Sequence, residues 1–429
     1  MVDANHRAQL NVCIIGGGPT GLAHIKILAE YNINVVCYES NLQVGGIWLF
    51  DKNNRGNQPM YCDLCTNIPA EQMQYSDLVM HSRYNYPTQS TVQQYLIDYS
   101  THFKLYQYIQ FDTTVQYVTR DNKTKSYTVT SYNKSTQHTS KQQFDAVIVA
   151  NGHFQIPSYP DFIDNTMIHS NDPNQAYIIH SINYYKASQF TNQRVLVIGG
   201  SHSGVDIANQ IASVATHVSV SLKTNVQNHF DGSVKATFDQ VAHIIASKDS
   251  VINNIDKLNR CGRVQSIDIN TKQVKFIDGT VHTYDSIICA TGYKYQFDFL
   301  DDTVKPNVID NRIEYMYQHL FDAAHTYDGS LAFPGITVRI VPFPMAEVQA
   351  NIIALVLLQR IKLPSKHQMI DWCNALYDSM KLQNRPERFT HFVQFHQYVQ
   401  SLIDWMDTDP NRQYQYTIYD DRRIRRVKR

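Results

Sequence analysis

The sequence lacks a hydrophobic run long enough to cross a membrane. Its longest apolar run near the carboxyl end, Ile352–Leu358, is far shorter than the roughly 20 residues that a transmembrane helix requires. The amino-terminal stretch MVDANHRAQL is polar and leads directly into the first apolar run, which leaves no room for the apolar region of a signal peptide. We therefore expect a cytoplasmic protein with no membrane span.

A surplus of either charge is also missing, because 38 Lys and Arg residues balance 38 Asp and Glu residues. This balance argues against nucleic acid as a partner, since nucleic acid binds to surfaces with a marked positive excess. The carboxyl-terminal stretch Arg422–Arg429 is rich in cations and contains no acid. We expect it to form a solvated tail, with contact to an anionic surface as the alternative.

The spacings typical of metal ligands are absent from the sequence as well. Histidine is frequent, at 18 residues, but the H-E-x-x-H spacing of zinc sites does not occur, and His391 and His396 do not share a helical face. We expect no metal site. The seven cysteines are odd in number, and some, such as Cys13 and Cys289, lie within apolar runs, so we expect reduced thiols rather than a disulfide framework.

The most informative stretch that is present is Leu10–Gly21, LNVCIIGGGPTG. An apolar run leads into the glycines and apolar residues at helical spacing follow them, which predicts a strand, a tight turn and a helix. A second apolar run ends at Glu39, the position at which a carboxylate binds a ribose hydroxyl in dinucleotide-binding folds. The predicted dinucleotide-binding residues are Gly16, Gly17, Gly18, Pro19, Thr20, Gly21 and Glu39.

The same order of strand, glycine turn and helix returns in Arg194–Ala208, with Gly199, Ser201 and Gly204 at the motif positions. Ser201 replaces the middle glycine, so a diphosphate must approach a slightly bulkier turn. The next predicted strand ends at Lys223, where a cation suits the 2′-phosphate of NADPH. The chain is therefore predicted to contain two nucleotide-binding folds.

Two shorter stretches of interest follow the first motif. The adjacent glycines of Gly45–Trp48 let the backbone approach a flat ring or a diphosphate, and the tryptophan can cover it. Cys62 and Cys65 have the C-x-x-C spacing of a redox pair, which beside a flavin would belong to a disulfide reductase. Neither cysteine has a basic residue or a histidine next to it in the sequence to activate the thiol, which argues against this interpretation.

Taken together, the motifs resemble those of the flavin-containing monooxygenases, the class B flavoprotein monooxygenases that use FAD and NADPH, and the resemblance spans essentially the whole chain. Gly16–Gly21 with Glu39 resembles the family's FAD fingerprint, and Gly199–Asp206 resembles its NADPH site. Further stretches that are similar to family motifs are Gly45–Trp48, Thr66–Asn67, Tyr75–Asp77, Ala290–Tyr293 and Ala346–Ala350.

The motif F-x-G-x-x-x-H-x-x-x-Y, which identifies the family, is present only in part. His180–Tyr184 fits, but Asn174 and Ala176 stand where the family has Phe and Gly, which leaves the subfamily open. The carboxyl-terminal membrane anchor of the mammalian members has no counterpart, so we expect similarity to the shorter, soluble members of fungi, bacteria and insects.

The resemblance implies an α/β fold with two Rossmann-like dinucleotide-binding domains, in which the NADPH-binding domain is inserted into the FAD-binding domain. We expect the first part of the FAD-binding domain in residues 1–165 and a linker in 166–190. The NADPH-binding domain is expected in 191–292, and the second part of the FAD-binding domain, with carboxyl-terminal helices and the basic tail, in 293–429.

The function implied by the resemblance is that of an N,N-dimethylaniline monooxygenase-like enzyme of the EC 1.14.13 type. It would use NADPH and O2 to oxygenate a nucleophilic nitrogen or sulfur of a small amine or sulfide, via an FAD C4a-hydroperoxide stabilised by bound NADP+. Because the cofactor carries the chemistry, no catalytic triad is needed. A homo-oligomer is compatible with the sequence.

Asn67 is the implied catalytic residue and also an implied cofactor contact, because an uncharged amide donates and accepts hydrogen bonds without protonating the peroxide. The other implied cofactor-binding residues outside the first glycine turn are Gly46, Ile47, Trp48, Thr66, Ile68, Gly199, Ser201, Ser203, Gly204, Val205, Asp206, Lys223, Thr291 and Gly292.

Three alternatives stay open at the level of sequence. A Baeyer–Villiger oxygenase shares both nucleotide folds and oxidises ketones. A flavin-dependent thiol–disulfide oxidoreductase would use Cys62 and Cys65. A non-catalytic NADPH sensor would bind the dinucleotide and consume no oxygen.

Overall fold

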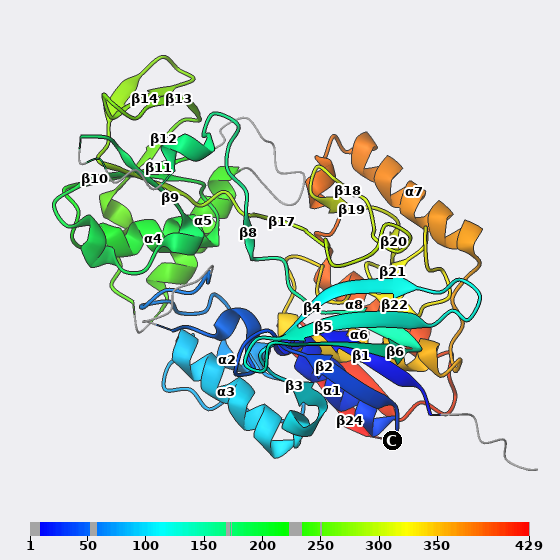
Figure 1. Cartoon of the computed structure of the whole chain (residues 1–429). Coiled ribbons are helices and arrows are strands. Elements are labelled where there is room, and N and C mark those ends of the chain that lie inside the picture. The colour runs from blue at the N-terminus through cyan, green and yellow to red at the C-terminus, as the bar shows by residue number, and fades with distance from the viewer. Residues whose placement is uncertain are drawn as a thin grey trace, which may run out of the picture.

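The computed structural model describes residues 9–51, 58–168, 172, 174–222, 234–248 and 251–428, without the side chains of 234–237. These residues form two lobes, each built on a largely parallel sheet with helices packed on it (Figure 1). The arrangement confirms the predicted α/β fold with two Rossmann-like domains.

The sheet of the first lobe combines strands from both ends of the chain. In spatial order its strands are β20 (Met316–Tyr317), β21 (Phe321–Asp322), β22 (Leu331–Ala332), β7 (Ala146–Val149), β1 (Asn11–Ile15), β2 (Asn34–Tyr38) and β3 (Ile109–Gln110). β1 lies between β2 and β7 in parallel register, so that Ile15 pairs with Tyr38 on one side and with Val149 on the other. A strand covered on both faces carries a continuous apolar run, which is the pattern that predicts β1.

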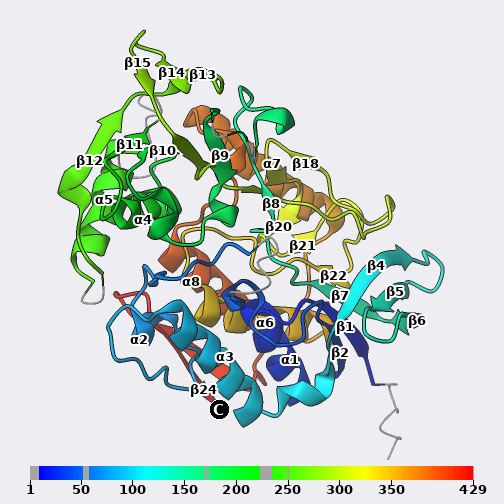
Figure 2. The same cartoon turned by 60° about the vertical axis from the view of Figure 1, so that its left-hand side comes forward.

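The helices of the first lobe come from distant parts of the chain. They are α1 (Pro19–Glu30), α2 (Ala70–Met73), α3 (Gln89–His102), α6 (Pro342–Leu357), α7 (Lys366–Leu382) and α8 (Phe395–Met406). α6 packs against both α1 and α8 and is buried from Phe343 to Val356. Both views place the carboxyl-terminal helix α6 beside the amino-terminal helix α1 (Figures 1 and 2).

The sheet of the second lobe is parallel throughout. In spatial order its strands are β12 (Leu258–Cys261), β11 (His217–Ser221), β10 (Arg194–Ile198), β16 (Ser286–Cys289) and β9 (Tyr177–His180), and its helices are α4 (His202–Ile211) and α5 (Val234–Ala246). We expected residues 166–190 to be a linker, but β9 lies within them and pairs with β16 as an edge strand. Ile178 and Ile179 on this strand are both buried, and this apolar burial favours its place in the sheet.

The remaining elements are short or form small antiparallel sheets. Two three-stranded sheets contain β4 (Thr113–Arg120), β5 (Tyr127–Asn133) and β6 (His138–Phe144), and β13 (Val264–Asp268), β14 (Gln273–Phe276) and β15 (Val281–Thr283). One two-stranded ladder contains β18 (Val308–Ile309) and β19 (Arg312–Ile313). Single 3-10 turns are η1 (Gly46–Trp48), η2 (Leu105–Tyr108), η3 (Asn165–Met167), η4 (Ser181–Asn183), η5 (Ala187–Phe190), η6 (Ile255–Lys257) and η7 (Glu387–Phe389).

The chain crosses between the lobes at β8 (Ile156–Pro157) and β17 (Tyr293–Lys294), which lie side by side between the two sheets (Figure 1). The two strands pair antiparallel, and Ser158 N–H donates to Gly292 O at 2.9 Å. Each crossing follows a glycine after a central strand: β17 begins directly after Gly292, and β8 begins a few residues after Gly152. The second lobe is thus inserted through two adjacent connections.

The cationic carboxyl terminus is not the solvated tail that we expected. β23 (Tyr414–Ile418) and β24 (Ile424–Lys428) form an antiparallel hairpin, and the side chain of Arg426 on β24 is only 4% exposed. The hairpin strand places Arg426 among acids of the first lobe, which explains its burial. Within the described part of the chain, no helix is both long and apolar enough to cross a membrane.

Candidate functional site

The first glycine turn, between β1 and α1, is shaped by two close backbone approaches. Gly16 has φ +108°, and a Cβ there would lie 2.6 Å from the carbonyl oxygen of Ala150. A Cβ on Gly21 would lie 1.9 Å from the carbonyl oxygen of Gly16. Both positions therefore exclude a side chain for reasons of the fold itself.

Gly18 differs, because its backbone is extended, with φ −75° and ψ −177°, and a Cβ there would meet only ordinary contacts of 3.4 Å or more. The protein therefore tolerates a side chain at this position. The absence of one leaves space at the start of α1, where the fold would place a diphosphate.

Glu39 provides the carboxylate expected at the end of β2. It is 3% exposed, and its Oε2 accepts a hydrogen bond from Gly17 N–H at 2.6 Å, while its Oε1 accepts from Asn41 N–H at 2.8 Å. A carboxylate oxygen has two lone pairs, so Oε2 retains the capacity to accept from a ribose hydroxyl. The geometry fits the adenosine half of a dinucleotide.

The segment Gly45–Trp48 lies directly against this turn. Gly45 N–H donates to Gly17 O at 3.1 Å, and a Cβ on Gly46 would lie 2.9 Å from the Cα of Gly18. Trp48 is buried edge-on against Phe343 of α6, with ring centroids 6.5 Å apart. The first glycine turn and the segment Gly45–Trp48, which are separate motifs in the sequence, therefore pack against each other. Pro19 and Thr20 belong to the first of these motifs and Ile47 to the second.

The second glycine turn, between β10 and α4, repeats the geometry of the first. Gly199 has φ +119°, and a Cβ there would lie 2.3 Å from Ala290 O, as a Cβ on Gly16 would meet Ala150 O. A Cβ on Gly204 would lie 1.9 Å from Gly199 O. Ser201 has φ −93°, a conformation that any residue adopts, so the serine imposes no strain on the turn.

Both helix amino-termini are free of side-chain caps. Neither Gly18 nor Ser201 caps its helix with a side chain, and the first turns of α1 and α4 contain no acid. The backbone N–H groups of a helix start need acceptors and attract anions. The two described helix starts thus fit the diphosphates of two dinucleotides, FAD at α1 and NADPH at α4.

The residues after Ser201 have unequal access to a ligand. Ser203 is exposed at the start of α4, whereas the side chain of Val205 is fully buried in the second core, so only its backbone is available. The Asp206 carboxylate is buried and accepts hydrogen bonds from Tyr61 Oη at 2.6 Å and Gln210 Nε2 at 3.2 Å. Asp206 therefore contacts the other lobe, which the sequence motif did not indicate.

Thr66 and Asn67 follow the segment that Tyr61 begins. Thr66 is buried, its N–H donates to Pro87 O at 2.9 Å, and its hydroxyl donates to Ile68 O at 2.8 Å. Asn67 is exposed, and within the described residues its carboxamide has no hydrogen-bond partner. Hydrogen bonds thus hold the backbone of this turn, and the Asn67 amide is free to bind a ligand.

Thr291 and Gly292 lie at the crossing between the lobes. The Thr291 hydroxyl donates to Ser158 O, and Gly292 O accepts from His180 Nε2–H at 3.0 Å. His180 Nδ1 accepts from Ile182 N–H at 3.2 Å, which fixes the neutral tautomer, and burial lowers the pKa of His180 to about 4. His180, from the part of the family motif that is present, therefore helps to fix the connection between the lobes. Lys223, the predicted 2′-phosphate ligand, lies outside the described residues.

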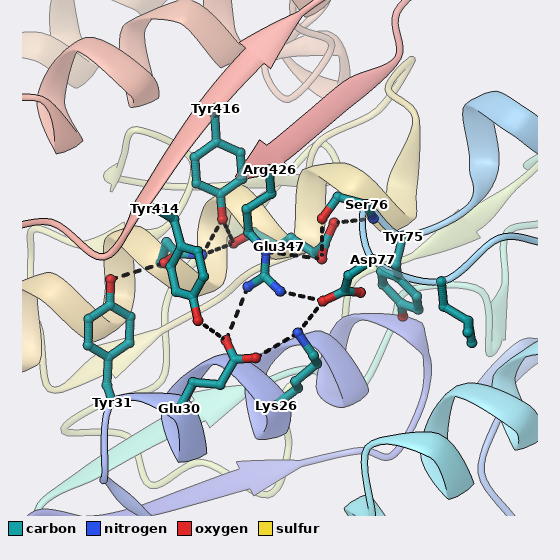
Figure 3. A network of polar contacts seen from close by, with 12 residues as sticks. Lys26, Glu30, Tyr31, Tyr75, Ser76, Asp77, Glu347, Tyr414, Tyr416 and Arg426 are labelled. Carbon is teal, nitrogen blue, oxygen red and sulfur yellow. Dashed lines mark hydrogen bonds and ion pairs between the residues drawn. The ribbon is translucent and has the colours of Figure 1, made fainter. Parts of the chain in front are cut away.

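A polar network behind α1 connects three motifs that are far apart in the sequence (Figure 3). Arg426 Nη1 lies 3.2 Å from Glu30 on α1, Nη2 contacts Asp77, and Nε lies 3.8 Å from Glu347 on α6. Tyr75, from the same loop as Asp77, donates through its hydroxyl to Pro19 O at 2.6 Å. The network thereby supports the first turn of α1 from beneath.

Sequence analysis missed Arg426 because its neighbours in the tail are also cations. The available signal was the strand-like alternation in Tyr414–Ile418, which pairs with it. Among the described residues, no group of three or more His, Cys, Asp or Glu side chains could hold a metal ion.

The chain is similar over most of its length to flavin monooxygenases. The family model FMO-like, flavin-binding monooxygenase-like, matches residues 9–231 and 239–424. Flavin-containing monooxygenase FMO GS-OX-like 2 from Arabidopsis thaliana is 30% identical over 410 residues, which cover 89% of this chain and 81% of that protein.

Solved structures show the same likeness. S-allyl-L-cysteine S-oxygenase from Allium sativum matches with a TM-score of 0.77 and 27% identity, covering 93% of this chain and 89% of that chain. Tmm from Pelagibacter sp. matches with a TM-score of 0.74 and 21% identity, covering 94% and 87%, which shows a shared fold.

Proposed function

Because the chain belongs to the flavin-binding monooxygenase-like family, an FAD- and NADPH-using family, we propose that it oxygenates a nucleophilic sulfur or nitrogen of a small molecule. In the overall reaction, NADPH supplies two electrons, one atom of O2 is transferred to the substrate, and the other leaves as water with a proton from solvent. FAD would supply this redox chemistry when bound, and the two glycine turns would hold it and the nicotinamide cofactor.

The residues of the chain hold and orient the two cofactors. The turn at Gly16–Gly21 with the start of α1 binds the FAD diphosphate, and Glu39 accepts from its ribose. The turn at Gly199–Gly204 with the start of α4 binds the NADPH diphosphate. Gly46, which lies against Gly18, would also contact the FAD, together with Trp48 and Ile68.

Asn67 is the residue that we propose to act at the reacting centre. Its carboxamide is exposed and has no partner among the described residues, so it is free to donate to one cofactor and accept from the other. This free amide is the single structural observation that carries the proposal. An amide does not titrate in the physiological range, so it holds a reactive oxygen without supplying a proton to it.

A thioether sulfur is the first substrate to try. Support comes from the S-oxygenase of Allium sativum, which is 27% identical to this chain over 93% of its length. Soft nucleophiles such as thioethers and tertiary amines attack an electrophilic oxygen without help from a protein base. This agrees with a site in which an amide, and no acid, is the proposed catalytic group.

The test is to follow NADPH oxidation, O2 uptake and product in the purified yellow protein with a thioether, a tertiary amine and a cyclic ketone in turn. We expect a sulfoxide or an N-oxide to form in proportion to NADPH consumed. A lactone from the ketone, with no sulfoxide, would instead indicate Baeyer–Villiger chemistry. Disulfide reduction that iodoacetamide abolishes would assign the activity to Cys62 and Cys65.

A further inference from the structure

The segment Tyr61–Cys65 belongs to the first lobe by sequence but packs into the core of the second lobe. Tyr61 is 4% exposed within the apolar cluster of that lobe, and its ring centroid lies 5.2 Å from that of Tyr184. Cys62 N–H donates to Tyr185 O at 3.0 Å. This segment is therefore a second tie between the lobes, distinct from the crossing at β8 and β17.

Two charged side chains of the second lobe converge on this segment. Asp206 on α4 accepts from Tyr61 Oη at 2.6 Å, and Lys248, just after α5, places its Nζ 3.7 Å from Asp206 Oδ1. The side chains of Lys248 and Asp206 are 2% and 9% exposed. Burial raises the pKa of Asp206, and the cation of Lys248 opposes that rise.

The Lys248 ammonium has a second partner that leads towards the proposed reacting centre. Its Nζ donates to the carbonyl oxygen of Cys65 at 3.1 Å, and Cys65 directly precedes Thr66 and Asn67. Nearby, Gln210 Nε2 donates to Asp63 O at 3.2 Å. The second lobe thus holds the backbone of this segment at two carbonyls.

The first lobe holds the same segment from the other side. Gln89 N–H, at the start of α3, donates to Leu64 O at 3.0 Å, and Thr66 N–H donates to Pro87 O at 2.9 Å. Only Asn67 lacks such a contact among the described residues of the turn. Its position therefore depends on where the two lobes together place Cys65 and Thr66.

We propose that Tyr61, Asp206 and Lys248 form an interlobe latch, in which Lys248 is a positioning residue that sets Asn67 relative to the dinucleotide bound at α4. Asp206 follows the Ser201–Gly204 turn by half a helical turn on the same helix, so a ligand that orders the start of α4 also orders Asp206. An ordered Asp206 in turn holds Lys248 in place, and Lys248 holds the carbonyl oxygen of Cys65. The inference rests on the proposed function only where its test measures oxygenated product.

The test replaces Lys248 with methionine, which keeps the apolar length of the side chain and removes both the cation and the donor to Cys65 O. In Lys248→Met we expect unchanged FAD content and little change in the KM for NADPH. Product formed per NADPH should fall by about tenfold, with hydrogen peroxide making up the difference, because small displacements of a positioned group are costly. Lys275→Met, at an exposed lysine of β14 in the same lobe, should behave as wild type.

Removing Lys248 alone leaves the buried Asp206 charge unpaired, which destabilises folding. The double variant Lys248→Met/Asp206→Asn removes both charges and should fold, yet the hydrogen bond from Lys248 to Cys65 O is still missing. We expect the same fall in product formed per NADPH in the double variant. A double variant that forms as much product per NADPH as wild type would overturn the latch.

Hydrogen exchange gives a readout that does not require turnover. In wild type, NADP+ should slow exchange at the start of α4 and in residues 61–68 together, and in Lys248→Met only at α4. Protection of residues 61–68 that persists in Lys248→Met would contradict the latch even if no oxygenated product is ever found. Conversely, the wild-type protein could show NADP+ protection of α4 and of residues 61–68 together but form no oxygenated product. That result would contradict the proposed function and still support the latch.

Discussion

The buried carboxylate of Glu347 on α6 accepts a hydrogen bond from the backbone N–H of Ser76, 271 residues earlier in the chain, at 2.9 Å. The Ser76 hydroxyl donates to the same carboxylate at 3.0 Å. Since Tyr75, the preceding residue, donates to Pro19 O, this contact links α6 to the first turn of α1 (Figure 3). The carboxylate therefore supports the turn at which we propose that FAD binds, although it lies outside that turn.

The first prediction concerns the pH dependence of stability. Burial raises the pKa of Glu347 to about 7, whereas in the unfolded chain it is about 4.3. Between these values the native state binds a proton that the unfolded state has released, so the free energy of unfolding falls as the pH rises. Replacing Glu347 with glutamine, whose amide oxygen still accepts from Ser76, should remove this fall, which is about 3 kcal/mol between pH 5 and pH 8.

The measurement is denaturant unfolding of the holoprotein at pH 5, 6, 7 and 8. Glu71→Gln, at an exposed glutamate of the first lobe, is the control and should retain the wild-type slope. Parallel curves for wild type and Glu347→Gln would show that Glu347 does not titrate in this range.

The second prediction is that Arg426 stabilises the fold. Its guanidinium is surrounded by Glu30, Asp77 and Glu347. Arg426→Met leaves the buried Glu347 carboxylate without this cation, while Lys26 still pairs with Glu30 and Asp77. We expect a loss of about 3 kcal/mol in the free energy of unfolding. The neighbouring exposed Arg425→Met should change it by less than about 0.5 kcal/mol, and equal losses in the two variants would disprove a specific role.

The third prediction separates a glycine that the fold requires from one that the cofactor requires. Gly18→Ala should fold with wild-type stability of the apoprotein but bind FAD at least about tenfold more weakly, because its Cβ would occupy space at the helix start. Gly16→Ala should unfold at lower denaturant, because of its positive φ and the Ala150 carbonyl. The measurement is FAD titration of each apoprotein, with Gly262→Ala as the control. FAD binding by Gly18→Ala that is as tight as in wild type would show that the diphosphate does not bind beside Gly18.

The fourth prediction concerns Asn67. Asn67→Asp introduces a charge and removes the donor, so oxygenated product should fall by about 100-fold while FAD stays bound and NADPH still reduces it. Single-turnover reduction and product yield are measured on the same preparation. Asn307→Asp, at an exposed position of the first lobe, is the control, and an Asn67→Asp enzyme that oxygenates normally would exclude the assigned role.

The sequence was sufficient for the two glycine turns because each depends on a local pattern of strand, turn and helix. Gly16, Gly21, Gly199 and Gly204 all occupy positions at which the backbone leaves no room for a side chain.

Contacts between distant residues were not predictable in this way. Arg426 and Glu30 are 396 residues apart, and nothing in a run of cations distinguishes the one that is buried. Lys248 likewise looks like an ordinary loop lysine until Asp206 and Cys65 O are found beside it. The pairing of β9 with β16 depends on the arrangement of the whole second sheet, and its short length hid it within a predicted linker.

The most direct test of the proposed function is isotope incorporation from 18O2 into a thioether product during NADPH-driven turnover. We expect one 18O atom in each sulfoxide molecule and one sulfoxide formed for each NADPH oxidised. Sulfoxide without label, or NADPH oxidation that yields only hydrogen peroxide with every thioether and amine tried, would contradict the assignment as a monooxygenase of these substrates.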